Sequence, residues 1–206
     1  MTMAWPSARL TLWVGAFLIV GATDAYGQED EAAPLTLKDA IRDSDASAVK
    51  TLIDGGADVN EPELLLFAVL RGGVEIVELL VDAGADVNLA VPVPPDQKEG
   101  LLRVFGSDAE VVVGTPLSVA ALMGRFAAAD VLLEEGADPN VVTGLGTPIG
   151  LAAARGHTDV LKLLIEAGGD ASGRSLTGTA AVMFSPLLLA ARAGHVDAAE
   201  LLVESG

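Results

Sequence analysis

The sequence predicts an all-α fold of about five stacked helix–turn–helix units, joined by loop or β-hairpin connections and interrupted by one long insertion. The first observation behind this prediction is a pentapeptide, Gly-Ala-Asp-x-Asn, that returns behind an apolar run. Its copies occupy residues 56–60, 84–88 and 136–140, and an altered copy occupies residues 168–172. These residue types favour a tight turn, because Gly tolerates positive φ and Asp and Asn side chains bond their own backbone. A fold built by repetition is typical of proteins whose task is binding.

The second observation is the spacing of apolar residues, which recur at i, i+3 and i+4 and so predict two helices in each unit. The expected first helices are residues 35–44, 63–72, 115–124, 147–156 and 185–194. The expected second helices are residues 45–55, 73–83, 125–135, 157–167 and 195–205. In three units the first helix opens with Thr-Pro or Ser-Pro, which places a hydroxyl at the N-cap and Pro at the first helical position.

The connection after Asn88 is an insertion, residues 89–114, whereas the other connections are shorter. Loops beyond about 12 to 15 residues are uncommon in compact domains and are often functional. Apolar runs at residues 101–105 and 109–113 flank a turn, so the insertion is expected to form a β-hairpin finger whose edge can pair with another chain. The alternative is a hairpin that folds back over neighbouring loops. The apolar stretch 178–184, in the connection before the fifth unit, is expected to fold over neighbouring loops in the same way.

The order of motifs within a unit is distinctive. In the fourth unit it runs Thr147-Pro148-Ile149, Ala152-Ala153, Gly156-His157, Leu163-Leu164 and Gly168. This order resembles the ankyrin repeat, and the resemblance covers residues 35–206. The five units are residues 35–60, 61–88, 115–140, 147–172 and 185–206. The histidine that usually follows Thr-Pro-Leu in that family is replaced by Leu66, Ser118, Gly150 and Leu188, so the family's Thr–His relay has no histidine here.

The resemblance implies a non-catalytic solenoid that binds proteins in a concave groove, formed by the loop tips and the exposed edge of the first helices. The eighth and ninth residues of each first helix are expected to face that groove. Arginines at these positions are Arg42, Arg71, Arg155 and Arg192, and the apolar residues between them are Leu70, Leu122 and Met123. Such a surface suits a partner segment whose carboxylates flank hydrophobic residues. The alternative is that the arginines pair with acidic neighbours of the same chain.

The insertion adds further candidate partner-binding residues, Arg103, Val104 and Phe105, on the first run of the expected finger. The two ends of the repeat array differ as well. The first helix of the first unit is rich in charged residues, which indicates an N-terminal capping repeat, because a terminal repeat needs a polar outer face. The last unit ends in a mostly apolar helix, residues 198–203. Two interpretations stay open: a truncated product, or an apolar flank that meets another subunit or partner.

Residues 1–27 have the composition of a signal peptide, with one arginine, an apolar run at residues 10–20 and small residues before Gly27. We expect export to the periplasm or out of the cell, with cleavage after Gly27. The alternative is an uncleaved anchor, although residues 10–22 fall short of the roughly 20 apolar residues that span a bilayer. Residues 28–34 are acidic, lack apolar periodicity and are expected to form a short linker.

The formal net charge of the chain is −17, and loss of residues 1–27 removes one acidic and one basic residue, so that charge is unchanged. Such a surface repels nucleic acid and anionic lipid. We therefore expect no nucleic-acid partner and no membrane insertion after signal cleavage. The chain has no cysteine, so no disulfide can support the fold and stability must come from the stacked repeats.

Catalytic and metal-binding patterns are weak. His157 and His195 occupy the same repeat position, directly after the glycine that ends the first helix, and are interpreted as helix-junction residues rather than a metal pair. The turns at residues 58–60 and 86–88 resemble the start of an EF-hand loop, but Gly and the bidentate Glu are missing at the required positions. We expect no metal, no cofactor and no enzymatic activity. The sequence therefore favours an exported scaffold for protein–protein interaction; the alternative is an accessory or protective subunit of an envelope enzyme complex.

Overall fold

The computed structural model describes residues 35–61, 63–71, 73–92, 113–173, 175–177 and 182–206. The expected signal peptide and linker lie outside this part of the chain. The first helices of the five units are α1 (Leu37–Arg42), α3 (Leu64–Arg71), α6 (Pro116–Met123), α8 (Pro148–Arg155) and α10 (Pro186–Ala193). The second helices are α2 (Ala46–Asp54), α4 (Val74–Asp82), α7 (Phe126–Glu134), α9 (Thr158–Glu166) and α11 (Val196–Ser205). The predicted all-α solenoid of helix pairs is confirmed.

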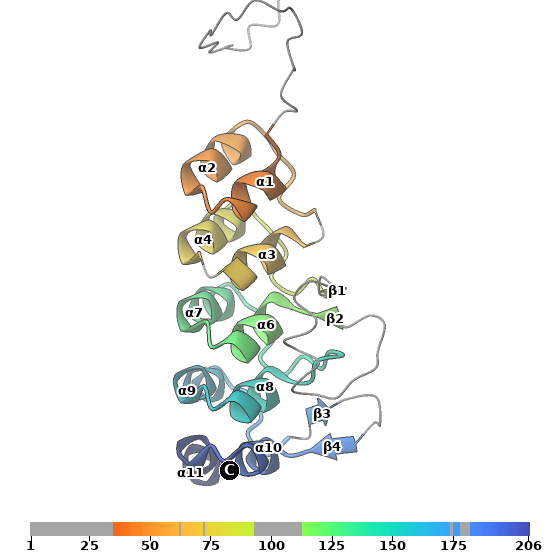
Figure 1. Cartoon of the computed structure of the whole chain (residues 1–206), viewed down its shortest axis with the longest axis vertical. Coiled ribbons are helices and arrows are strands. Elements are labelled where there is room, and N and C mark those ends of the chain that lie inside the picture. The colour runs from red at the N-terminus through yellow and green to blue at the C-terminus, as the bar shows by residue number, and fades with distance from the viewer. Residues whose placement is uncertain (1–34, 62, 72, 93–112, 174, 178–181) are drawn as a thin grey trace, which may run out of the picture. The chain divides into compact units, whose positions relative to one another are not determined.

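The helices form two parallel columns (Figure 1), because each first helix contacts the first helices of the neighbouring repeats and each second helix does the same in its own column. The hydrophobic core runs without interruption through all five repeats. It consists of small and branched aliphatic side chains such as Ile41, Leu80 and Leu132, each fully buried. Since the inner repeats bury their apolar faces against both neighbours, the free energy of folding comes from the contacts between successive repeats.

Hydroxyl side chains begin the first helices as the sequence predicts. Thr115, Thr147 and Ser185 are N-caps followed by Pro, and each side chain accepts a hydrogen bond from the backbone N–H three residues on. In the third repeat Ser118 stands where the family usually has histidine. Its hydroxyl accepts a hydrogen bond from Thr115 N at 2.9 Å and donates one to Thr115 O at 2.8 Å. Serine therefore satisfies the buried helix start through a reciprocal capping box.

The repeated pentapeptide forms the turn that the sequence predicts. In each copy the Asp carboxylate accepts a hydrogen bond from the backbone N–H two residues on, at 2.8 to 3.0 Å. The glycine that opens each copy has a positive φ, for example 91° at Gly84. Asp and Gly therefore act together, one as a side-chain acceptor and the other as the residue that tolerates the left-handed backbone.

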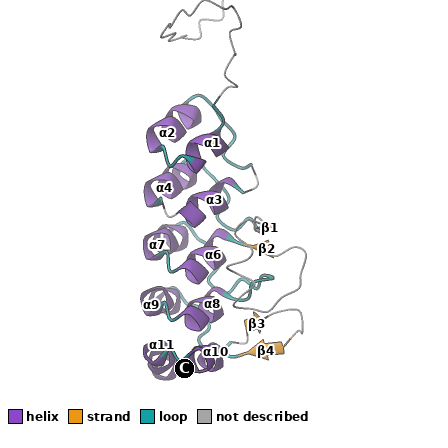
Figure 2. Ribbon diagram, in the orientation of Figure 1, coloured by secondary structure: helices purple, strands orange, loops and turns teal. Residues whose placement is uncertain are grey.

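Two short antiparallel ladders lie beyond the column of first helices, away from the second helices, in the view of Figure 2. Strand β1 (Val91–Pro92) pairs with β2 (Val113–Gly114), so the segments that precede and follow residues 93–112 lie side by side, just before α6. Residues 93–112, which include the expected finger, lie outside the described part of the chain. Strand β3 (Ser175–Thr177) pairs with β4 (Val182–Phe184) in the connection that leads to α10.

Candidate partner-binding surface

Two rows of side chains run across the C-terminal ends of the first helices. Both are located by counting back from the residue that precedes the N-cap of the second helix in each repeat; in four repeats this residue, Ser44, Gly124, Gly156 or Gly194, has a positive φ. The inner row holds Arg42, Leu70, Leu122, Ala154 and Arg192. The outer row, one residue further along each chain segment, holds Asp43, Arg71, Met123, Arg155 and Ala193. The four candidate arginines therefore lie in two different rows rather than in one stripe.

The inner row is not a binding surface in the middle of the stack. Leu70 is 9% exposed and Leu122 is 1% exposed, and both belong to the hydrophobic core. The expectation that these leucines form the apolar centre of an exposed groove is wrong. The physical reason is the stacking itself, since α3 and α6 pack against first helices of neighbouring repeats and bury this side of each helix.

The arginines of the inner row have partners within the chain. Arg42 Nη1 lies 2.8 Å from Asp39 Oδ1 in an exposed ion pair. A hydrogen bond from the Thr36 hydroxyl, with a smaller effect of Arg42, lowers the pKa of Asp39. The Arg192 guanidinium lies 5.2 Å from the centre of the Phe184 ring, within the range of a cation–π interaction. For these two arginines the structure favours pairing within the chain.

The outer row differs from the inner row because its side chains in the middle of the stack are at least partly exposed. Arg71 is exposed, Met123 is 37% exposed, and Arg155 is half-buried. Since α3 contacts α6 and α6 contacts α8, the three residues follow one another from repeat to repeat, and we call them the Arg–Met–Arg row. Within the described residues neither arginine forms an ion pair. The Nε atom of Arg155 is also shielded from solvent without a hydrogen-bond partner there.

The histidines act at the junctions between repeats. The Nε2 atom of His157 lies 3.2 Å from Leu122 O at the end of α6, and its ring lies against Gly124. Arg125 takes the same place one repeat earlier, where its Nη2 donates to Leu70 O at 3.3 Å. Burial lowers the pKa of His157. The predicted helix-junction role is thus confirmed, with the addition that the contact crosses from one repeat to the one before it.

The asparagines that close the pentapeptides have a role that sequence reasoning missed. Asn88 Oδ1 accepts a hydrogen bond from Asp138 N at 2.9 Å, and its Nδ2 donates to Gly136 O at 3.1 Å. Asn60 and Asn140 make the same pair of bonds to the next pentapeptide. The sequence signal for this role is the recurrence of Asn at the last position of the pentapeptide. These bonds tie the loop edge of successive repeats together, across the insertion as well.

A family model described as ankyrin repeats (3 copies) matches residues 37–143 and again residues 117–206. The chain belongs to the ankyrin-repeat family. Ankyrin repeats generally mediate protein–protein interaction, and members of the family are typically non-catalytic scaffolds. A comparison with curated proteins found no match.

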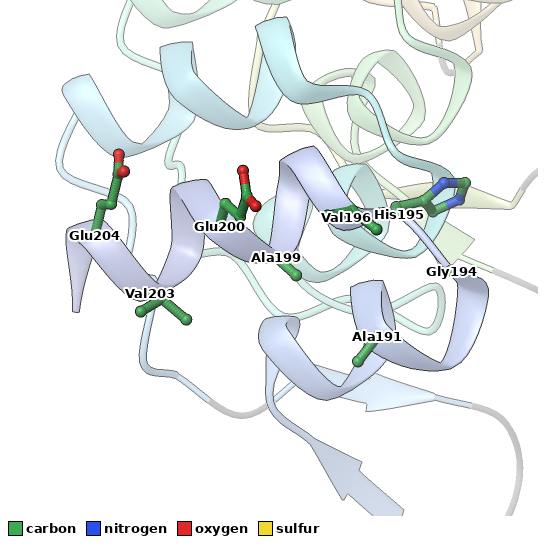
Figure 3. A pocket seen from close by; sticks show the side chains of 8 residues that line it. All are labelled: Ala191, Gly194, His195, Val196, Ala199, Glu200, Val203 and Glu204. Carbon is green, nitrogen blue, oxygen red and sulfur yellow. The ribbon is translucent and has the colours of Figure 1, made fainter.

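The last ankyrin repeat presents an apolar face (Figure 3), which we call the end face. Four large side chains on α10 and α11 are well exposed: Leu187 at 38%, Leu188 at 44%, Val196 at 64% and Val203 at 65%. A pocket lies between the two helices, lined by Ala191, Gly194, His195, Val196, Ala199, Glu200, Val203 and Glu204. The end face is therefore apolar along its centre, and the Glu200 and Glu204 carboxylates point to the side of α11 away from Ala199 and Val203 (Figure 3).

Other site chemistry is sparse in these ankyrin repeats. Among the described residues no three His, Cys, Asp or Glu side chains are grouped so that they could hold a metal ion. None of the described helices has the length and apolar character needed to cross a membrane. The candidate residues Arg103, Val104 and Phe105 lie outside the described part. The surfaces that remain as candidates are the Arg–Met–Arg row and the end face.

Proposed function

We propose that the protein is an exported, non-catalytic ankyrin-repeat scaffold that binds another protein through its Arg–Met–Arg row and its insertion. The observation that carries this proposal is that Arg71 and Arg155 flank the exposed side chain of Met123 while forming no ion pair with described residues. In a chain of net charge −17, two cationic groups that form no ion pair with the described residues make an unusual patch. A partner that supplies carboxylates would complete it.

The row also constrains the shape of the partner segment. Packed helices lie about 8–10 Å apart, so Arg71 and Arg155, two repeats apart, are separated by roughly 16–20 Å. An extended chain rises about 3.3 Å per residue, so two carboxylates about six residues apart would reach both guanidinium groups. Apolar residues two and four positions after the first carboxylate would lie on the same face as both carboxylates and meet Met123, whose flexible thioether adapts to different shapes. The favoured partner segment is therefore Glu-x-Leu-x-Leu-x-Glu or a close variant in extended form, in which all four named side chains share one face.

Export and the insertion are part of the same proposal. The composition of residues 1–27 supports a signal peptide and delivery to the periplasm or cell exterior. The β1–β2 ladder supports the insertion as a second contact, because it pairs the segments on either side of the insertion, Val91–Pro92 and Val113–Gly114, at the N-terminal end of α6, the helix whose C-terminal end carries Met123. The second candidate function is an accessory or protective subunit of an envelope enzyme complex, which the exposed apolar end face favours.

The row is tested with a fluorescent peptide containing Glu-x-Leu-x-Leu-x-Glu and the purified chain from residue 28 onward. Saturable binding that weakens by at least about tenfold in Arg71→Glu and Arg155→Glu is expected, because each reversal replaces an attraction by a repulsion. Arg42→Glu and Arg192→Glu are matched controls, since both arginines have partners within the chain. Unchanged peptide binding together with a lower melting temperature for Arg71→Glu and Arg155→Glu would show that the row serves stability alone.

The insertion is tested by deleting residues 96–110. Co-purification from the native envelope fraction is expected to lose the partner, while circular dichroism keeps the full helical signal of the repeats. Loss of helical signal instead would mean that the insertion covers apolar surface of the stack. A partner retained by the deleted chain but lost by Arg155→Glu would assign recognition to the row alone.

A further inference from the structure

Phe126 is a large apolar side chain that lies exposed in the third of the five repeats. It is the first residue of α7 and is 46% exposed. The residues that begin the other second helices are all smaller: Ala46, Val74, Thr158 and Val196. Helices α7 and α9 contact each other in the column of second helices, on the far side of the first helices from the β1–β2 ladder (Figure 1). Phe126 therefore has repeats on both sides of it, and its exposure does not depend on either end of the repeat stack.

A groove begins at Phe126 and follows α9. Phe126 and Asp159 both line two adjoining hollows of about 330 Å³ each, and one of these hollows extends along a face of α9. On α7 two acidic residues follow Phe126 at intervals of four positions, which places them on the same side of that helix. We call this surface the acidic groove, and its members are Phe126, Asp130 and Glu134 of α7 and Asp159, Lys162, Leu163 and Glu166 of α9.

The negative charge of the acidic groove is largely uncompensated. Lys162 Nζ lies 3.8 Å from Glu166 Oε1 in an exposed pair. Within the described part of the chain Asp130, Glu134 and Asp159 form no ion pair. The helices α4, α7, α9 and α11 each carry at least two acidic residues, and Lys162 is the only lysine or arginine within them. The acidic groove therefore attracts cationic groups of a partner and repels anionic ones.

The other two phenylalanines that the structure describes each have a cation over the ring. Lys38 Nζ lies 5.0 Å from the centre of the Phe67 ring, and the Arg192 guanidinium lies 5.2 Å from that of Phe184. No cation of the described residues lies over the Phe126 ring in this way. An exposed ring beside an unpaired carboxylate suits a guanidinium group, because that group can stack on the ring and donate hydrogen bonds to the carboxylate.

We infer that the acidic groove docks an arginine-containing segment of another protein, with one guanidinium over the Phe126 ring and paired with Asp159. Asp159 and Glu166 are seven residues apart on α9, so at about 1.5 Å per residue they are separated by roughly 10 Å along the helix. Two arginines four positions apart in an extended segment share one face at a separation of about 13 Å, and their flexible side chains can make up the difference. A leucine midway between them lies on the same face and meets Leu163. The favoured segment is therefore Arg-x-Leu-x-Arg, opposite in charge to the segment that fits the Arg–Met–Arg row.

The test uses a fluorescent peptide containing Arg-Ser-Leu-Ser-Arg and the purified chain from residue 28 onward, with binding followed by fluorescence anisotropy. Saturable binding is expected, at least about tenfold tighter than that of a peptide with citrulline, a neutral analogue, in place of both arginines. Phe126→Leu keeps an apolar side chain but removes the ring, and should weaken binding by about threefold. Asp159→Asn should weaken binding by about fivefold or more. Lys162→Gln should strengthen binding by at least about twofold, because it removes a competing cation, and a loss of stability could not produce such a gain.

Glu75→Gln is the matched control for Asp159→Asn. Both residues are exposed in the first turn of a second helix, but the second helix of the repeat before Glu75 begins with Ala46 instead of Phe. Its affinity should change by less than about twofold. Equal losses for the two variants, equal binding of the arginine and citrulline peptides, or no binding would overturn the acidic groove as a docking site. Tighter binding by the chain lacking residues 96–110 would show that its own insertion occupies the groove, and would overturn the assignment to another protein. Arg71→Glu is expected to leave this binding unchanged, so the outcome is independent of the Arg–Met–Arg row.

Discussion

The ring of His195 lies so close to Gly156 that a β-carbon on this glycine would come within 2.5 Å of the His195 Nδ1 atom. A glycine that ends one repeat and a histidine that opens the second helix of the next therefore form one contact. Gly156 and His157 are neighbours in the sequence, but Gly156 contacts His195 of the following repeat, and His157 lies against Gly124 of the preceding one.

Gly156→Ala is expected to destabilise the chain by about 2–4 kcal/mol, since it combines strain at positive φ with displacement of the His195 ring. Gly194→Ala is the control, because it has the same backbone strain and open space around the new methyl group, and it should cost only about 1 kcal/mol. Urea denaturation of the two variants measures the difference. Equal losses would mean that the contact between Gly156 and the His195 ring adds nothing to stability.

Asn140→Ala is expected to cost about 1–2 kcal/mol, because it removes the hydrogen bonds to Asp170 N and Gly168 O that join the fourth pentapeptide to the third. Asn140→Asp keeps the acceptor for Asp170 N but sets a carboxylate oxygen against the Gly168 carbonyl, so its loss should be at least as large. Ser172→Ala is a control, since the Ser172 hydroxyl bonds only Asp170 of its own turn. Native-state hydrogen exchange of Asp170 N would report the same change locally.

His157 predicts a dependence of stability on pH. Its pKa is lowered below 6.5, first by burial and further by the charges of Arg155 and His195, against a raising effect of the bond to Leu122 O. The unfolded chain therefore binds a proton more readily than the folded chain. Stability should be complete above pH 6.5 and decrease as the pH falls through that value, levelling off below the folded pKa. His157→Gln should reduce this decrease between pH 7.5 and 5, measured as the change in urea midpoint.

Thr115→Val should cost about 1–2 kcal/mol, because Thr115 is 1% exposed and its hydroxyl is the acceptor for the backbone N–H of Ser118. Ser185→Ala removes an equivalent cap at Leu188 N, where the surroundings are exposed to water. Its loss should be smaller, at about 0.5–1 kcal/mol. Thermal unfolding at one pH compares the two variants, and a larger loss for Ser185→Ala would contradict the role of burial.

Local signals in the sequence were enough to predict the helices. The hydroxyl-Pro starts and the Gly-Ala-Asp-x-Asn turns act over three to five residues, and Thr115 caps its helix as expected. The failures concern contacts between repeats. Periodicity on one helix could not tell that neighbouring repeats bury Leu70 and Leu122 while leaving Met123 exposed. The bond from Asn88 to Asp138 was equally hidden, because it joins residues on both sides of the insertion.

The partners of the candidate arginines could not be assigned from sequence either. Arg42 pairs with Asp39 one helical turn away, which i,i+3 spacing permits but does not require. Arg192 meets Phe184 because the β3–β4 hairpin leads directly into α10, and the position of that hairpin is a property of the fold. Arg71 and Arg155 remain as the arginines of the candidate site, which is smaller than the stripe predicted from counting positions.

The two-residue ladder of Val91–Pro92 with Val113–Gly114 has a consequence for how such a protein can diversify. The ladder pairs the chain segment before the insertion with the segment after it. The hydrogen bond from Asp138 N to Asn88 Oδ1 also joins the second and third repeats, which the insertion separates in the sequence. The entropic cost of closing a loop grows only slowly with its length. Residues 93–112 can therefore be replaced by segments of other lengths and sequences between the same two strands, β1 and β2. A new partner specificity can arise in this way without a change in the repeat stack.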